Sequence, residues 1–204
     1  SDFLKEYGYD VVWLTRNKSL VAEKPLRNFY WNPRTAEIDM NALNEVATVI
    51  NLAGTSISKR WTRSNKKDII NSRIDSVKTL QIAIAKLNSP NKPKVINASA
   101  IGVYESSKSL IHDEYSTNYN TSFLGEVVDK WEGCIVDFDK INVSYCMLRI
   151  GIVMSKKGGA LKELLKPAKF GFIAPLGDGK QWQSWIALED LLHLIKTLIE
   201  NPIS

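Results

Sequence analysis

Residues 47–54, Ala-Thr-Val-Ile-Asn-Leu-Ala-Gly, are the stretch on which the reading of the whole chain depends. A short apolar run that ends at a glycine is typical of a buried parallel strand whose carboxyl end opens into a loop. In open α/β sheets, ligands bind just beyond such carboxyl ends, where the strand order reverses. Ala53 and Gly54 carry almost no side chain, so a flat ligand can approach the backbone there. An ordinary strand-to-helix turn would have the same sequence.

Outward from this stretch, strand-like runs alternate with segments of helical periodicity. We predict strands at residues 10–15, 27–31, 47–52, 94–99 and 143–150. We predict helices at residues 3–8, 38–46, 61–87, 121–139, 160–170 and 188–200. This alternation predicts an α/β fold with a doubly wound parallel sheet.

Composition limits the class of protein. The chain has 204 residues, 44% of them hydrophobic, which is enough for one core. It has no apolar run of membrane-span length, so we expect no membrane partner. The net charge is +5, but the densest basic group, residues 59–67, lies at the start of a predicted helix, where a solvated face is the commoner reading. We therefore expect no nucleic-acid partner.

Cysteine and histidine usage points to the cytoplasm and away from metals. Cys134 and Cys146 are the only cysteines, and both lie in apolar patterns. Free buried thiols in a reducing compartment fit this pattern better than a disulfide, so a cytoplasmic location is expected. His112 and His193 are the only histidines, and we expect no metal centre.

The end of the strand at 10–15 carries a cofactor signal. Arg16 and Lys18 follow it, with no acidic residue nearby. In dinucleotide-binding units an acidic residue at the end of the second strand binds the ribose hydroxyls, whereas an arginine there accommodates a 2′-phosphate. The two cations therefore favour NADP over NAD, although exposed loop cations would look the same.

Eight short motifs also recur in a fixed order. They are Leu14-Thr15-Arg16, Asn51-Leu52-Ala53-Gly54, Ser72-Arg73, Ala98-Ser99-Ala100, Trp131-Glu132, Leu148-Arg149-Ile150-Gly151-Ile152-Val153, Gly158-Gly159-Ala160-Leu161 and Pro175-Leu176-Gly177-Asp178-Gly179-Lys180-Gln181-Trp182. Together they resemble the epimerase family (NAD-dependent epimerase/dehydratase-like) of atypical short-chain dehydrogenases/reductases, some of which are described as cell-division-inhibitor-like. The resemblance covers nearly the whole chain.

The resemblance implies an NADP(H)-binding Rossmann core over residues 1–150, interleaved with a small substrate-binding region that starts in residues 151–204. It implies cofactor contacts at Thr15, Arg16, Leu52, Ala53, Gly54, Ser99, Gly151, Ile152 and Val153. Gln181, Trp182 and Trp185 would face the substrate, although core packing would explain the tryptophans equally well. Extended members of the superfamily often form dimers through the helices that correspond to 61–87 and 121–139, so a homodimer is also expected.

The usual catalytic groups of the superfamily are missing from their expected positions. Phe123 stands where the tyrosine is expected, and Val127 where the lysine is expected. Ala100 replaces the expected hydroxyl residue. Phenylalanine cannot transfer a proton. Ser99, Tyr104 and Glu126 are the nearest substitutes. Of these, Ser99 and Tyr104 are the candidate catalytic residues, although hydrogen bonding within a loop would explain Ser99 as well.

The fold implied by the resemblance opens with a strand and a G-x-x-G-x-x-G turn that binds the pyrophosphate. This sequence starts within the helix that would follow that turn, and it stops soon after Asn201-Pro202, short of what the resemblance implies. We therefore expect a chain truncated at both ends. The absent strand would lie between 10–15 and 47–52 in the usual strand order.

Two functions remain open. One is an NADP(H)-dependent epimerase or oxidoreductase that acts on a small polar metabolite, such as a sugar nucleotide. The other is a protein that binds NADP(H) without turnover, as a sensor or scaffold, for example in cell-division regulation.

Overall fold

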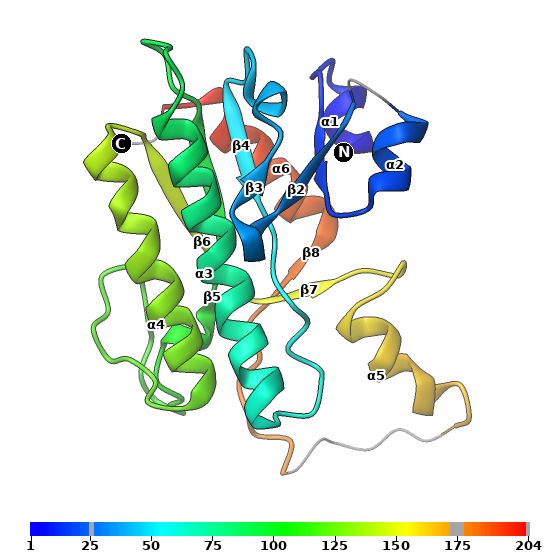
Figure 1. Cartoon of the computed structure of the whole chain (residues 1–204). Helices are drawn as coiled ribbons and strands as arrows, with labels where there is room; N and C mark the ends of the chain where they lie inside the picture. Colours follow the sequence, from blue (N-terminus) through cyan, green and yellow to red (C-terminus); the bar gives the residue numbers. More distant parts are fainter. Residues whose placement is uncertain (25–26, 172–177, 203–204) are drawn as a thin grey trace.

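The computed structural model describes residues 1–24, 27–171 and 178–202, and Figure 1 shows its α/β architecture. A first sheet has the order β1–β2–β3, from β1 (Trp13–Thr15), β2 (Asn28–Asn32) and β3 (Glu37–Ile38). A second has the order β4–β5–β6, from β4 (Thr48–Asn51), β5 (Lys94–Ala100) and β6 (Tyr145–Ile150). β7 (Ile152–Met154) pairs with β8 (Trp185–Ala187). All of these pairs are parallel except β2–β3.

The described residues form six α-helices, which are α1 (Asp2–Glu6), α2 (Lys18–Glu23), α3 (Arg63–Ala85), α4 (Phe123–Ile135), α5 (Ala160–Ala168) and α6 (Leu188–Glu200). Of these, α2, α3, α4 and α5 connect parallel strands, whereas α1 precedes β1 and α6 follows β8. Short 3₁₀ helices occur at Pro33–Thr35, Met40–Leu43, Ile101–Val103 and Val136–Ile141. The predicted class, an α/β fold with a parallel Rossmann-type arrangement, is confirmed.

The core lies between the long helices α3 and α4 and the strands β4–β6. Val77, Leu80 and Ile84 of α3 are at most 1% exposed because they recur on one face of the helix. Trp131 and Ile135 of α4 belong to the same cluster of buried side chains. In Figure 1 the two helices lie side by side in front of the strands. This packing fixes the carboxyl ends of β4, β5 and β6 relative to one another.

The first two sheets do not join. Within the described residues β1 pairs only with β2, and β4 pairs only with β5. The interruption falls where the sequence predicts a gap, between the strand at 10–15 and the strand at 47–52.

The segment beyond residue 150 packs back onto the first part of the chain. The Lys94 ammonium donates hydrogen bonds to the carbonyl oxygens of Leu198, Ile199 and Asn201, at 2.7–2.8 Å, and so caps the carboxyl end of α6. Tyr9 donates a 3.0 Å hydrogen bond to Glu200 at the same end. α6 is therefore anchored to the N-terminal part, and the division into residues 1–150 and 151–204 stays a prediction.

One predicted element is wrong, and the structure also has α2, β7 and β8, for which no element is predicted. The helix at 38–46 is wrong, because Ile38 pairs with Trp31 in β3 and only Met40–Leu43 is helical, as a 3₁₀ turn. The sequence analysis also missed α2. Its signal was Asn17, whose side chain accepts a hydrogen bond from the Ser19 amide and caps the helix.

Candidate cofactor site

The loops that follow β4 and β5 and the segment that precedes β8 gather at the lower end of the molecule in Figure 1. Because β4, β5 and β6 are parallel, their carboxyl ends meet at this one edge. The predicted residues Leu52, Ala53 and Gly54 follow β4, and Gly151 follows β6. Ser99 is the penultimate residue of β5.

Two buried asparagines, Asn51 and Asn97, hold the loop after β4 through hydrogen bonds. The Asn51 amide donates hydrogen bonds to the Asn97 side-chain oxygen, at 2.6 Å, and to the Ser76 hydroxyl, at 3.2 Å. The Asn51 side-chain oxygen accepts a 3.2 Å hydrogen bond from the Ala53 amide. All three polar side chains are at most 3% exposed, so leaving one unpaired would be costly. The pair therefore holds the loop where Leu52, 62% exposed, faces solvent.

The Ser72–Arg73 dipeptide of α3 clamps the far end of the same loop. The Ser72 hydroxyl accepts a 2.9 Å hydrogen bond from the Thr55 amide, and the Arg73 guanidinium donates a 3.2 Å hydrogen bond to the Thr55 carbonyl oxygen. A Cβ atom at Gly54 would lie 3.2 Å from the guanidinium carbon. Burial lowers the pKa of Arg73 from its usual value. A cation thus lies directly beneath the exposed backbone of Gly54.

Thr15 and Arg16 lie at the end of β1. The Thr15 hydroxyl accepts a 3.1 Å hydrogen bond from the Asn17 amide and so shapes the turn. Arg16 is exposed, and no described acidic side chain forms an ion pair with it. Its guanidinium is available to an anion in solution.

A buried polar network links β5, α4 and β6 beside the site. Arg149 forms a bidentate pair with Glu132, with N–O distances of 2.9 and 2.8 Å. The Ser99 hydroxyl donates a 2.5 Å hydrogen bond to the same carboxylate. A third nitrogen of Arg149 donates to the Tyr104 hydroxyl oxygen, at 2.8 Å, and to the Glu114 carbonyl oxygen, at 3.3 Å. The two candidate catalytic residues, Ser99 and Tyr104, are therefore joined through one ion pair.

This pairing fixes the charges of the network. The hydrogen bond to Glu132, followed by that to Tyr104, raises the pKa of Arg149, although partial burial opposes the shift. The side chains of Arg149 and Glu132 are 19% and 11% exposed. A buried pair of this kind is held by bidentate hydrogen bonds in addition to charge.

The sequence analysis quoted Glu132 and Arg149 as parts of motifs but gave neither a role. A signal was present in the sequence. Arg149 interrupts the apolar run of a strand, and Glu132 lies beside Trp131 on the apolar face of a helix. A charge in such a position needs a partner, because an unpaired buried charge is strongly unfavourable.

Gly151 lies at the turn from β6 into β7. A Cβ atom there would come within 2.7 Å of the Ser184 carbonyl oxygen, so only glycine fits without displacing that segment. The Ile152 amide donates a 2.9 Å hydrogen bond to the same oxygen, and Val153 pairs with Ile186 of β8. A cavity of about 260 Å³ adjoins this turn, lined in part by Gly151, Ser184 and Trp185.

The predicted substrate residues lie on the segment that leads into β8. Trp182 is 80% exposed, and its indole N–H points to the Lys108 carbonyl oxygen at 3.4 Å. Trp185 is 62% exposed at the start of β8. Gln181 is also exposed. Core packing does not explain the two tryptophans, and their contact with a substrate stays a prediction.

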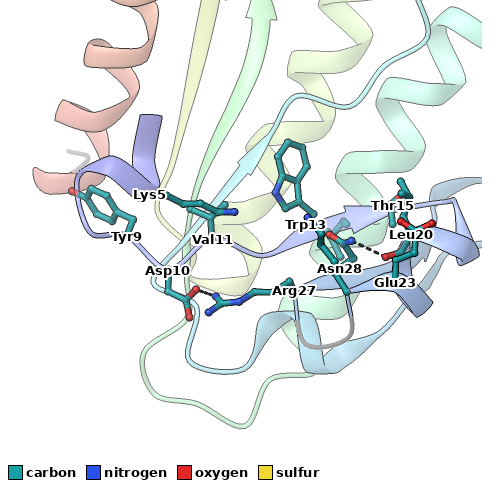
Figure 2. A pocket seen from close by; sticks show the side chains of 12 residues that line it. Lys5, Tyr9, Asp10, Val11, Trp13, Thr15, Leu20, Glu23, Arg27 and Asn28 are labelled. Carbon is teal, nitrogen blue, oxygen red and sulfur yellow. Dashed lines mark hydrogen bonds and ion pairs between the residues drawn. The ribbon is translucent and has the colours of Figure 1, made fainter. Parts of the chain in front are cut away.

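A second and larger hollow, of about 840 Å³, lies beside β1 and α2 (Figure 2). Asp10 and Arg27 form an ion pair across it, and Asn28 donates a 2.7 Å hydrogen bond to the Leu20 carbonyl oxygen. Of the predicted site residues only Thr15 lines this hollow. Cavity volume alone therefore does not identify the candidate cofactor site. The place where the carboxyl ends of the parallel strands converge is the better indicator.

Two searches of the described residues gave negative results. No group of three or more His, Cys, Asp or Glu side chains is placed to hold a metal ion in these ranges. Within them, too, no helix is both long and apolar enough to cross a bilayer.

The residues present suit a dinucleotide. Gly54 is exposed, the cation of Arg73 lies beneath it, and Arg16 offers a second cation that no described acidic side chain pairs with. An anionic ligand that carries a flat ring matches this set of groups.

Comparison with known proteins gives a consistent picture. The model of the NAD-dependent epimerase/dehydratase family matches residues 1–204. An epimerase family protein of Staphylococcus saprophyticus is 36% identical over 192 residues, which cover 90% of this chain and 62% of the relative. One from Mycobacterium bovis is 33% identical over 174 residues, covering 85% of this chain and 56% of the relative. The chain thus spans less than two thirds of the length of these relatives.

Solved structures agree with this comparison. The human epimerase family protein SDR39U1 (isoform 2), crystallised with NADPH, superposes with a TM-score of 0.80 at 25% identity, over 98% of this chain and 64% of that one. A UDP-glucuronic acid 4-epimerase of Bacillus cereus, in complex with UDP-glucuronic acid and NAD, gives a TM-score of 0.76 at 18% identity, over 98% and 68% of the two chains. The second likeness concerns the fold alone.

Proposed function

Because the chain belongs to the NAD-dependent epimerase/dehydratase family, we propose that it binds NADP(H) and serves an epimerase- or oxidoreductase-like reaction on a small polar metabolite. The observation that carries the choice of NADP(H) is Arg16, an exposed cation without a described ion-pair partner, at the end of β1. An arginine at this point suits a 2′-phosphate. The SDR39U1 structure with NADPH supports the same choice.

In this proposal, the end of each strand contacts a different part of the cofactor. Arg16 would bind the 2′-phosphate, with Thr15 shaping its turn. Leu52, Ala53 and Gly54 would line the adenosine and pyrophosphate side, above Arg73. Gly151, Ile152 and Val153 would lie against the nicotinamide, with Ser99 nearby. When bound, the nicotinamide ring supplies or accepts a hydride.

The substrate would enter from the side of Gln181, Trp182 and Trp185. Two exposed indole rings offer stacking surfaces for a flat or sugar-bearing ligand. A sugar nucleotide combines such a ring with a sugar and phosphates, and we propose this class. The half-buried free thiols of Cys134 and Cys146 fit a reducing compartment, and we place the protein in the cytoplasm.

Replacing Arg16 tests the cofactor assignment. We expect Arg16→Ser, in the full natural protein that contains this chain, to weaken NADPH binding roughly 10–100-fold, since a charge-assisted hydrogen bond contributes about 1.5–3 kcal/mol. NADH binding should be unchanged, because NADH lacks the 2′-phosphate. Calorimetric titration measures both affinities.

Lys24→Ser is the matched control, because it removes another exposed cation of the same segment. It should leave both affinities within twofold. Equal binding of NADPH by wild type and Arg16→Ser would refute the assignment.

A second function, binding of NADP(H) without turnover, is favoured by one observation. Phe123, which packs against Trp61 with ring centroids 5.1 Å apart, and Val127 are the residues that the motif resemblance puts at the positions of the superfamily's catalytic tyrosine and lysine. A panel of UDP-sugars that elicits no change in NADPH absorbance and no epimerised product by NMR would favour this sensor role. Turnover of any member would exclude it.

A further inference from the structure

We propose that Tyr104 is the catalytic acid/base of this site and that Arg149, held by Glu132 and Ser99, is the positioning residue that replaces the absent lysine. This inference rests on the proposed function, and it gives that function the proton-transfer group that it otherwise lacks.

The first support is the hydrogen bonding of Tyr104. Its hydroxyl oxygen accepts a 2.8 Å hydrogen bond from the Arg149 guanidinium. No described residue accepts a hydrogen bond from the same hydroxyl, so its proton is available to an outside acceptor. A phenol that accepts from a cation and keeps its own proton is arranged as a proton donor.

The second support is the fixed orientation of the ring. The Tyr104 amide donates a 3.1 Å hydrogen bond to the Ile101 carbonyl oxygen, and a β-bridge joins Tyr104 to Tyr119. The imidazole of His112 stacks on the ring, with centroids 5.1 Å apart and 15° between the planes. The hydroxyl is thus held by backbone, ring stacking and a charged hydrogen bond together.

The third support is the anchoring of the cation. Glu132 holds Arg149 through two hydrogen bonds, and the Ser99 hydroxyl donates to the same carboxylate. Because the Ser99 hydroxyl proton points to the Glu132 carboxylate, Ser99 orients the Arg149–Glu132 pair. Tyr104 is then the hydroxyl group that can donate a proton to the substrate. Arginine does not give up its own proton in proteins, so Arg149 acts by charge. A lysine beside a catalytic tyrosine has the same electrostatic effect.

The location also fits. Arg149 lies on β6 two residues before Gly151, at the turn assigned to the nicotinamide. Tyr104 follows β5, which pairs with β6 so that Ser99 and Arg149 are register partners. The phenol therefore lies at the carboxyl end of the strand pair that leads into that turn.

The step balances as follows. In reduction of a substrate carbonyl, a C–H bond of the reduced nicotinamide would break and its hydride would join the carbonyl carbon. The C=O π bond would open, the Tyr104 O–H bond would break, and its proton would bond to the carbonyl oxygen. The resulting phenolate is paired with the charge of Arg149 and regains a proton from water. In the oxidative direction the phenolate accepts the proton of the substrate hydroxyl. NADPH is the reductant and NADP⁺ the oxidant.

The chemical reactivity of the phenol tests this arrangement without substrate or cofactor. An aryl sulfonyl fluoride forms an O–S bond with a phenolate and releases fluoride, and mass spectrometry follows labelling at each tyrosine. We expect Tyr104 to react several-fold faster than Tyr115, although Tyr115 is 83% exposed and Tyr104 is half-buried. The Arg149→Lys variant should keep part of this advantage.

Removing the Arg149 cation should abolish the faster labelling of Tyr104 relative to Tyr115. A double variant, Glu132→Gln with Arg149→Gln, avoids a lone buried carboxylate, and its melting curve checks folding. Reactivity of Tyr104 no greater than that of Tyr115 in the wild type overturns the proposal. So does full Tyr104 reactivity in the folded double variant.

Cofactor binding separates this proposal from the proposed function. We expect Tyr104→Phe and the matched control Tyr115→Phe to bind NADPH within twofold of wild type. With NADPH and a panel of glyceraldehyde, dihydroxyacetone and UDP-sugars, Tyr104→Phe should lose about 100-fold or more of the wild-type rate, and Tyr115→Phe none. A rate retained within tenfold in Tyr104→Phe overturns the proposal while the function stands. Absence of NADPH binding in the wild type overturns both.

Discussion

Gly125 and Gly133 belong to the same helix, α4, but differ in what a side chain would meet. A Cβ atom at Gly125 would overlap the carbonyl oxygen of Asn120, whereas one at Gly133 has nothing within 4 Å. We expect Gly125→Ala to destabilise the fold by roughly 1–3 kcal/mol, because the backbone must move. Gly133→Ala should stabilise it by roughly 0.5–1 kcal/mol through helix propensity. Urea unfolding measures both, and a Gly125→Ala midpoint equal to that of wild type would contradict the packing described.

At the scale of single residues, the sequence suggested candidate site residues but could not show how they are connected. Ser99 and Tyr104 are visible as hydroxyl residues near a strand end. Their connection depends on Arg149 and Glu132, which lie 17 residues apart on a strand and a helix. Nothing local in the sequence shows that a hydroxyl donates inward to a carboxylate, as that of Ser99 does.

At the scale of elements, the carboxyl end of α6 is stabilised from another part of the chain. The Lys94 ammonium donates to three carbonyl oxygens there, which supplies both hydrogen bonds and a favourable charge at the negative end of the helix. Lys92 is the matched control, since it donates to a single carbonyl, that of Ile141. We expect Lys94→Met to cost roughly 1–3 kcal/mol and Lys92→Met roughly 1 kcal/mol or less. Thermal unfolding compares the two, and equal losses would show that the cap does not stabilise α6.

Element prediction succeeded where apolar periodicity was long. The last helix was predicted at 188–200 and is found there, and α3 lies within the predicted 61–87. It failed where a few residues decide the structure. Ile38 is predicted in the helix at 38–46, but pairing with Trp31 makes it part of the strand β3. Such short segments take their conformation from tertiary partners.

At the scale of the whole molecule, the sequence predicted a parallel doubly wound sheet, because strand-like runs alternate with segments of helical periodicity. The break between β1 and β4 was also predicted, from the usual strand order. The hollow beside β1 in Figure 2 could not be predicted, since it depends on how side chains of α1, β1 and α2 meet. An interleaved C-terminal region is what the resemblance implies, but the contacts that anchor α6 to the first part of the chain, through Lys94 and Tyr9, could only be found in the structure.

The measurement that tests the central claim most directly is hydrogen exchange of the full natural protein with and without NADPH. The account predicts protection by NADPH at four separate strand ends, in residues 13–17, 51–55, 99–104 and 150–154, while the carboxyl end of α6 is unchanged. Protection that is absent, or confined to the hollow around Tyr9 and Arg27, would contradict a cofactor site built from these strand ends.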